Sequence, residues 1–386
     1  MKIIIAPDSF KGSMTSVEAA EQMKQGILAV DPMLDISMIP VADGGEGTVD
    51  AITIALQGEK VVKQVNDPIG RLIDAEFGWV PKSKTAVVET AAASGLPLLM
   101  EEELDPVNAS TYGTGELVKE ALEKGAERII LGLGGSATVD AGTGFLEALG
   151  VRFLGDNGEE IRASGGTLSK IASIDSTKLD KRLENVEFMV ASDVTNPLLG
   201  EKGAVAVFGP QKGVKNDQIS QFERGMAHYA QQVIRHTGKD FAEEEGSGAA
   251  GGFGFSLLSF LEPSIESGFE MMARLSDLEE KIKAASFVIT GEGKLDTQSL
   301  FGKVPIGIAR LAKRNHIPAI AFTGKIEGDL TLVKDEGLEL VLPIVDAAMS
   351  LDDALTNGKE LLYRASRRFI ETIHFSKKLK GGTINE

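Results

Sequence analysis

Five glycine-rich loops constrain the fold of this chain more than any other feature, because most of them directly follow short apolar runs typical of buried strands. In open α/β sheets, ligands bind beyond the carboxyl ends of the strands, so these positions predict a sheet with a binding site at its edge. Glycine lets the backbone approach a phosphate closely, and amides at a following helix N-terminus face the anion. The loops span residues 6–13, 40–48, 132–142, 191–197 and 290–297.

The same loops carry the charged side chains that phosphoryl transfer uses. That reaction needs cations on the phosphate oxygens, carboxylates to hold Mg²⁺, and a carboxylate to orient the accepting hydroxyl. Acids beside a phosphate loop would repel a nucleotide unless a cation lies between them, so the pattern favours Mg²⁺. The acids are Asp8, Asp43, Glu46, Asp193, Glu292 and Asp296, and the cations are Lys11 and Lys294.

Each loop taken alone also has a purely structural explanation. A glycine-rich turn can simply permit tight packing, and an aspartate at a helix start is often an N-cap. That explanation is favoured for Asp140, which lies just inside a predicted helix. Asp8 and Asp193 lie at predicted strand ends without a following pattern that demands a cap, so a functional role is favoured there.

Strand and helix signals alternate at both ends of the chain, which predicts parallel pairing with right-handed crossovers. Between these ends, residues 59–90 contain three extended segments separated by turn signals, typical of an antiparallel meander. We therefore predict an α/β fold with a discontinuous domain (1–58 and 284–376), an inserted α/β domain (59–283) and a disordered tail (377–386). Within it, we expect helices at 139–150 and 351–373 and a strand at 287–290.

Composition excludes several function classes. A net charge of −17 over 386 residues opposes binding to nucleic acid, which depends on clustered Lys and Arg. The absence of cysteine excludes a thiolate metal site and a cysteine nucleophile. The first residues predict a β-strand instead of a signal peptide, and no apolar run reaches the roughly 20 residues that span a bilayer. We expect a cytoplasmic protein without nucleic-acid or membrane partners.

Known nucleotide motifs were tested against the sequence. No G-x-x-x-x-G-K-[ST] sequence occurs, which excludes a P-loop mechanism. Residues 132–137 do fit the weaker dinucleotide pattern G-x-G-x-x-A. About 20 residues further on lies Arg152 in place of an acidic ribose ligand, so a NADP-linked oxidoreductase stays open as an alternative function.

Six long motifs in order resemble the bacterial glycerate kinase family, the type without a P-loop. The motifs are APDSFKGS (6–13), PVADGGEGT (40–48), GLGGSATVDAGTG (132–144), ASDVTN (191–196), GPQKG (209–213) and TGEGKLDTQSLFGKVP (290–305). The resemblance implies ATP-dependent phosphorylation of D-glycerate with Mg²⁺, at the 2-hydroxyl to give 2-phosphoglycerate. It also implies two α/β domains, one of them Rossmann-like, with the active site in the cleft between them. A 3-phosphoglycerate product and the oligomeric state stay open.

Individual roles were assigned from chemistry. Asp193 or Asp43 is expected to orient the hydroxyl, and Lys11 and Lys294 to neutralise phosphate charge. Glu292 and Asp296 are the expected Mg²⁺ ligands. The expected substrate-binding residues are Asp8, Ser9, Lys11, Gly44, Gly45 and Arg71, and the expected ATP-binding residues are Gly134, Gly135, Ser136, Gly291, Gly293 and Lys294.

Overall fold

The computed structural model describes residues 1–42, 45, 47–295, 303–328 and 331–381. The chain divides into two compact units. The first unit comprises Met1–Asp43, Asp50–Ala55 and Phe269–Glu386, and the second comprises Gly44–Val49 and Leu56–Gly268.

The first unit is built on a parallel five-stranded sheet with the order β14-β13-β12-β1-β2. Its strands are β1 (Lys2–Ile5), β2 (Asp35–Met38), β12 (Phe287–Leu295), β13 (Ala319–Ile326) and β14 (Leu338–Pro343). All four neighbouring pairs run parallel, as the alternation of strand and helix signals predicts. Ile3, Ile4 and Ile5 of β1 are fully buried, which indicates that both faces of the sheet are covered.

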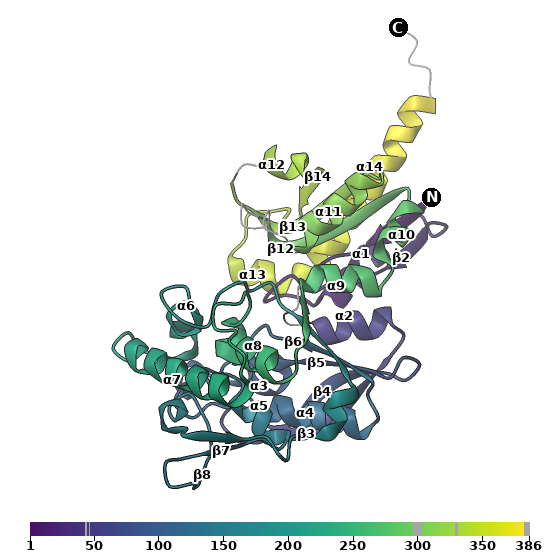
Figure 1. The fold of residues 1–386 in the computed structure, drawn as a ribbon. Helices are drawn as coiled ribbons and strands as arrows, with labels where there is room; N and C mark the ends of the chain where they lie inside the picture. The colour runs from purple at the N-terminus through teal and green to yellow at the C-terminus, as the bar shows by residue number, and fades with distance from the viewer. Residues whose placement is uncertain (43–44, 46, 296–302, 329–330, 382–386) are drawn as a thin grey trace. The chain divides into compact units, whose positions relative to one another are not determined.

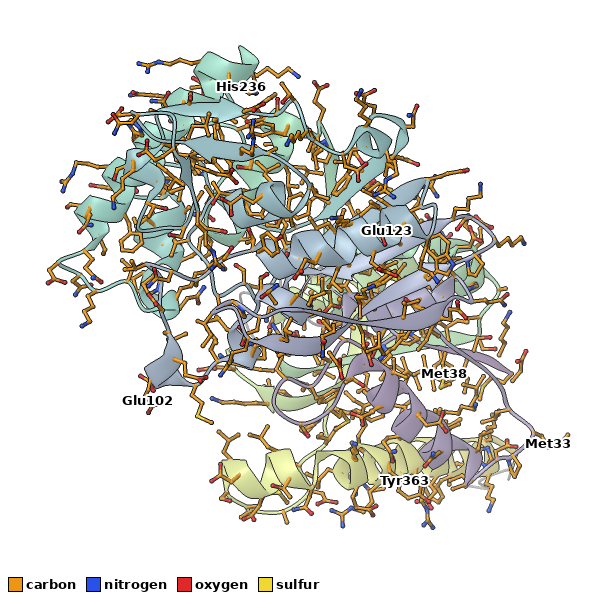
Figure 2. The ribbon with its side chains drawn as sticks, turned by 90° about the horizontal axis from the view of Figure 1, so that it is seen from below. Met33, Met38, Glu102, Glu123, His236 and Tyr363 are labelled. Atoms are coloured by element: carbon orange, nitrogen blue, oxygen red, sulfur yellow. The ribbon has the colours of Figure 1, made fainter. Side chains whose placement is uncertain are left out.

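Helices cover this sheet (Figure 1). They are α1 (Ser16–Leu28), α2 (Thr48–Ala55), α9 (Gly268–Leu275), α10 (Leu278–Lys283), α11 (Val304–Arg314), α12 (Thr331–Asp335), α13 (Leu351–Thr356) and α14 (Gly358–Gly381). A capping box formed by Thr15 and Glu18 starts α1. Apolar residues of α1 and α14 form one core with Ile3, Ile5 and Phe322 of the sheet. The two helices lie side by side, with Tyr363 marking α14 in Figure 2.

The second unit contains a six-stranded sheet with the order β11-β10-β6-β5-β4-β3. The meander predicted over 59–90 forms β3 (Glu59–Asn66), β4 (Leu72–Val80) and β5 (Thr85–Glu89), which pair antiparallel. From β5 onward the sheet is parallel, through β6 (Arg128–Gly132), β10 (Glu187–Ala191) and β11 (Ser264–Glu266). The carboxyl ends of β6 and β10 therefore lie next to each other and carry the loops at 132–142 and 191–197.

A small antiparallel sheet and six helices complete the second unit. The sheet has the order β8-β7-β9. Its strands are β7 (Arg152–Leu154), β8 (Glu160–Ile161) and β9 (Ser173–Asp175). The helices are α3 (Thr90–Ser94), α4 (Tyr112–Glu123), α5 (Thr143–Ala148), α6 (Ala204–Phe208), α7 (Ile219–Thr237) and α8 (Ala249–Phe260).

Several predicted boundaries are corrected by the structure. Strand β12 continues to Leu295, where the sequence predicts a loop after residue 290, because it stays paired with β13. The helix predicted at 139–150 is only Thr143–Ala148, and the closing helix is divided into α13 and α14. Helix α14 extends to Gly381, so residues 377–381 of the expected disordered tail are helical.

The return of the chain to the first unit also comes earlier than the sequence predicts. The unit resumes at Phe269, not at 284. The physical reason for this earlier return is that Phe269 packs against α11. The contact is so close that a Cβ added to Gly307 would lie 2.4 Å from the Phe269 ring. Helices α9 and α10 therefore belong with the sheet of the first unit. No helix in the described part of the chain is long and apolar enough to cross a membrane.

Candidate active site

A cavity of about 570 Å³ opens at the carboxyl edge of the parallel sheet of the first unit. Its lining comes from the loop after β1, from the ends of β12 and β13, and from the chain around the start of α14. The charged side chains that line it are Asp8, Lys11, Glu292, Lys294, Lys303 and Lys325. The structure thus brings Asp8, Ser9 and Lys11 of the first loop together with Glu292, Gly293 and Lys294 of the fifth loop.

The loop after β1 is held by backbone bonds to the neighbouring strand and to itself. The Asp8 amide donates to the Gly291 carbonyl at 2.9 Å, and the Ser9 amide donates to Asp8 Oδ1 at 2.6 Å. The Phe10 amide donates to the Met14 carbonyl at 2.9 Å, which closes a tight turn. Gly12 lies in that turn at φ +78°, a conformation that glycine adopts without strain. The turn fixes Lys11 at the rim of the cavity.

Glu292 is the acid of the fifth loop (290–297) that the structure describes. It lies within β12 opposite Thr323 of β13 and is 6% exposed. The Lys303 ammonium lies 3.5 Å from its Oε2. Asp8, also 6% exposed, lines the same cavity. Two nearly buried carboxylates thus share the lining with four lysines, which leaves an excess of positive charge in the pocket.

The lysines of the pocket keep their ammonium groups accessible. Lys294 pairs with Glu327 at 2.7 Å, and Lys325 contacts the same carboxylate at 3.5 Å. Both lysine side chains are at least 49% exposed, so these pairs are weak and can be exchanged for a stronger anion. The pairing with Lys294 is the largest of the effects that lower the pKa of Glu327.

The glycines of the fifth loop (290–297) have a packing role that the sequence did not reveal. A Cβ at Gly291 would lie 2.5 Å from the Phe322 carbonyl oxygen on the neighbouring strand. A Cβ at Gly293 would lie 3.3 Å from the Lys11 amide nitrogen. Gly293 therefore lets the Lys11 loop approach β12, whereas Gly291 is required by the sheet itself.

The carboxylates of the pocket are suited to a Mg²⁺ ion that keeps several waters. Asp8 and Glu292 supply oxygen ligands from one wall, and Mg²⁺ is usually held by one or two carboxylates together with substrate phosphates. No group of three His, Cys, Asp or Glu that could hold a metal occurs in the described ranges. Asp296, the second predicted ligand, lies outside the described residues, as do Asp43 and Gly44.

The loop at 132–142 lies in the second unit. It is contacted by a buried lysine whose role sequence reasoning missed. Lys212, from the GPQKG motif, is 2% exposed and donates to Ser136 Oγ at 2.7 Å and to the Thr138 carbonyl at 2.9 Å. Burial lowers the pKa of Lys212 to about 7, against an opposing effect of Asp140. Ser136 is thus a buried hydrogen-bond acceptor for Lys212, whereas Gly134 is partly exposed and Gly135 is exposed. The sequence feature that could have indicated this contact is the lysine in the glycine-bounded segment 209–213.

Asp140 has the structural role that was favoured from the sequence. Its Oδ2 accepts from the amide and hydroxyl of Thr111, both at 2.8 Å, and from the Gly144 amide at 3.2 Å. Its Oδ1 accepts from the Gly142 amide at 3.1 Å. Burial raises the pKa of Asp140, and these donors oppose the rise. The carboxylate ties the start of α5 to the start of α4.

The remaining predicted residues are placed as follows. Asp193 is exposed just beyond the carboxyl end of β10, as predicted. Arg71 contacts Asp67 at 2.5 Å, Glu103 at 2.6 Å and the Leu98 carbonyl at 3.0 Å, so it holds the turn after β3 together. The Gly45 carbonyl accepts from the Thr48 hydroxyl at 2.7 Å, at the start of α2. The substrate roles of Arg71 and Gly45 stay predictions.

The dinucleotide pattern at 132–137 lacks the geometry that a NADP site requires. In that site the glycine loop opens directly into a helix whose N-terminus meets the pyrophosphate. Here the Gly135 carbonyl accepts from the Leu96 amide at 2.8 Å, and the Ala137 amide donates to the Ser94 carbonyl at 2.9 Å. Helix α5 begins only at Thr143. The loop is paired with backbone around α3, which argues against an oxidoreductase.

Fold and pocket define the class: an α/β protein of two units, with a cavity lined by four lysines at the carboxyl edge of a parallel sheet. A model of the glycerate kinase family matches residues 3–374. The chain belongs to that family and is an enzyme of the kinase class, which confirms the resemblance seen in the motifs.

Individual relatives match over nearly the full length. A glycerate kinase of Bacillus subtilis strain 168 is 44% identical over 379 residues, covering 98% of this chain and 99% of the relative. A glycerate 2-kinase of Escherichia coli K12 is 42% identical over 381 residues, covering 99% and 100%. A crystal structure of a candidate glycerate kinase 2 from Salmonella typhimurium LT2 is 40% identical with a TM-score of 0.87, covering 98% and 99%.

Proposed function

We propose that the enzyme phosphorylates D-glycerate with ATP and Mg²⁺, on the 2-hydroxyl, to give 2-phosphoglycerate and ADP. The observation that carries this proposal is the cavity of the first unit, where four lysines and two nearly buried carboxylates share one lining. Such a set binds a polyphosphate and its metal ion together. The 2-hydroxyl is supported by the E. coli relative, which is named glycerate 2-kinase.

The chain's own residues would divide the work in the following way. Lys11 and Lys294 hold the transferred phosphate by charge, and the exposed pairing of Lys294 with Glu327 is replaced when phosphate binds. Asp8 and Glu292 would hold the metal ion, which supplies charge neutralisation between the phosphate oxygens. Lys303 offsets the charge of Glu292 in the absence of the metal, at 3.5 Å.

Asp193 is the proposed acceptor for the proton of the substrate hydroxyl. Asp193 lies just beyond the carboxyl end of β10, the edge of a parallel sheet at which α/β proteins bind their ligands. Asp43 is the alternative acceptor. A positioned acid of this kind contributes roughly 10²- to 10⁴-fold to the rate.

The test is to incubate the enzyme with ATP, MgCl₂ and D-glycerate and to identify the product by ³¹P and ¹H NMR. We expect a phosphorus signal coupled to the C2 proton of glycerate, and none when Mg²⁺ is removed with EDTA. Coupling to the C3 protons alone would correct the position of transfer. ADP formation that does not depend on glycerate, or no turnover, would overturn the proposed substrate. Oxidation of glycerate with NADP would revive the oxidoreductase.

A further inference from the structure

A second cavity, of about 640 Å³, lies within the second unit and involves none of the five glycine-rich loops. It is bordered by the end of β3, the start of α4, helix α5 and the strands β7 and β8 of the small sheet. Its polar lining consists of Asn66, Tyr112, Glu147, Arg152, Glu160, Arg162 and Lys178. The proposed reaction uses none of these residues, so the cavity has no assigned role.

Cationic side chains from three separate segments converge on this cavity. Arg152 is held by Asp175, whereas Arg162 and Lys178 have no ion pair or side-chain hydrogen bond with any residue that the structure describes. Surface lysines and arginines without an ion pair are common. Here, however, Arg162 and Lys178 line the same cavity in a chain of net charge −17. Local positive charge on an acidic protein concentrates anions at that place.

Glu147, an acidic residue of the cavity lining, is compatible with a bound anion. Glu147 of α5 accepts the Ala163 amide at 2.8 Å through one oxygen. Burial raises the pKa of Glu147 to about 7, with Asp140 and Glu160 adding to the rise and Arg162 opposing it. Near neutral pH the carboxyl is therefore protonated about half of the time and can donate a hydrogen bond. The Tyr112 hydroxyl, without a partner among the described residues, is a second donor.

We propose that this cavity is a second ligand site that binds a small divalent oxyanion, of the phosphate or carboxylate kind, through Arg162 and Lys178. Arg152 forms part of the cavity wall, where its ion pair with Asp175 holds its guanidinium in place. Glu147 and Tyr112 donate hydrogen bonds to the remaining oxygens. The site is distinct from the lysine pocket of the first unit, because no residue lines both cavities.

The experiment titrates the full-length enzyme with sulfate and, separately, with oxalate, at constant ionic strength set with NaCl. Both probes stay divalent between pH 6 and 8, and they separate tetrahedral from planar ligands. The readout is the methyl NMR signals of Val151 and Ile161, which line this cavity and not the other. We expect saturable shifts with at least one probe, and at least a tenfold weaker binding in Arg162→Ala with Lys178→Ala.

The control is Arg224→Ala, an exposed arginine on α7 without an ion pair in the described part of the chain. It removes one positive charge from the same unit, against two in the test variant, and should leave binding unchanged. Equal weakening in this control, or linear shifts that never saturate, would show general charge screening by an adventitious ion only and would overturn the site.

The dependence of binding on pH gives an independent check. Glu147 shares the cavity lining with Tyr112 of α4, Arg152 of β7, Glu160 of β8, Arg162 and Lys178. Asp140 also acts on Glu147, and Glu116 of α4 acts on Tyr112. As pH rises from 6 to 8, the ionisation of Glu147 places a negative charge beside the ligand, so binding should weaken. Glu147→Gln stays neutral, so we expect its binding at pH 8 to match that of wild type at pH 6. Identical pH profiles of the two proteins would contradict the assignment of Glu147.

Discussion

Lys212 carries a charge that its buried surroundings disfavour. Its folded-state pKa of about 7 lies below the ordinary 10.5, so between these values the unfolded chain binds more protons than the folded one. Stability therefore rises with pH across this window, by on the order of 1 kcal/mol per pH unit from this group. Lys212→Met should abolish that slope, while Lys215→Met, an exposed neighbour, should keep it. Urea unfolding at pH 7, 8 and 9 measures the difference, and parallel curves for wild type and Lys212→Met would refute it.

Asp193 provides the direct test of catalysis at the residue scale. If its carboxylate accepts the hydroxyl proton, Asp193→Asn lowers kcat by about 10²- to 10⁴-fold with little change in the KM for ATP. The control is Asp217→Asn, an exposed aspartate in the same unit. Steady-state kinetics with both variants at one pH are sufficient. A normal kcat in Asp193→Asn would transfer the role to Asp43.

At the scale of elements, β12 shows what sequence reasoning could and could not recover. The apolar run at 287–290 predicts a strand, but Gly291, Gly293 and Lys294 are typical of a loop, since glycine is poor in strands. Pairing with β13 from Val288 to Leu295 overrides that local preference. Asp8, Lys11, Glu292 and Lys294, which the sequence groups in two loops, line one cavity at the sheet edge, and their roles stay predictions. Lys212 was missed because its partners lie 74 to 76 residues earlier in the chain.

The two glycines of β12 should respond differently to the same substitution. Gly291→Ala places a methyl group 2.5 Å from a backbone oxygen of β13, so the strands must separate, at a cost of about 1–3 kcal/mol. Gly293→Ala meets its nearest atom, the Lys11 amide nitrogen, at 3.3 Å and needs only a small shift of that loop. Unfolding followed by far-UV circular dichroism should therefore rank Gly291→Ala below Gly293→Ala in stability. The reverse order would mean that the Lys11 loop is more rigid than the sheet.

For the whole molecule, the separate apolar packing of the two units in the described ranges implies two unfolding events. One core joins α1 and α14 to the parallel sheet, and the other contains Trp79, Phe145 and Tyr229 of the second unit. Chains of more than one domain often depart from two-state behaviour. Trp79 is the single tryptophan, 7% exposed and 5.7 Å from the Lys124 ammonium, so its fluorescence reports on the second unit.

Circular dichroism detects both units, and the two signals should therefore give different unfolding curves in urea. Under the proposed function, ATP with Mg²⁺ binds the lysine pocket of the first unit and stabilises it by mass action. Adding them should shift the dichroism curve to higher urea by more than the tryptophan curve. Because the ligand acts on the native state alone, the shift must grow with its concentration. Coincident curves at every ligand concentration would instead show that the two cores unfold as one cooperative structure.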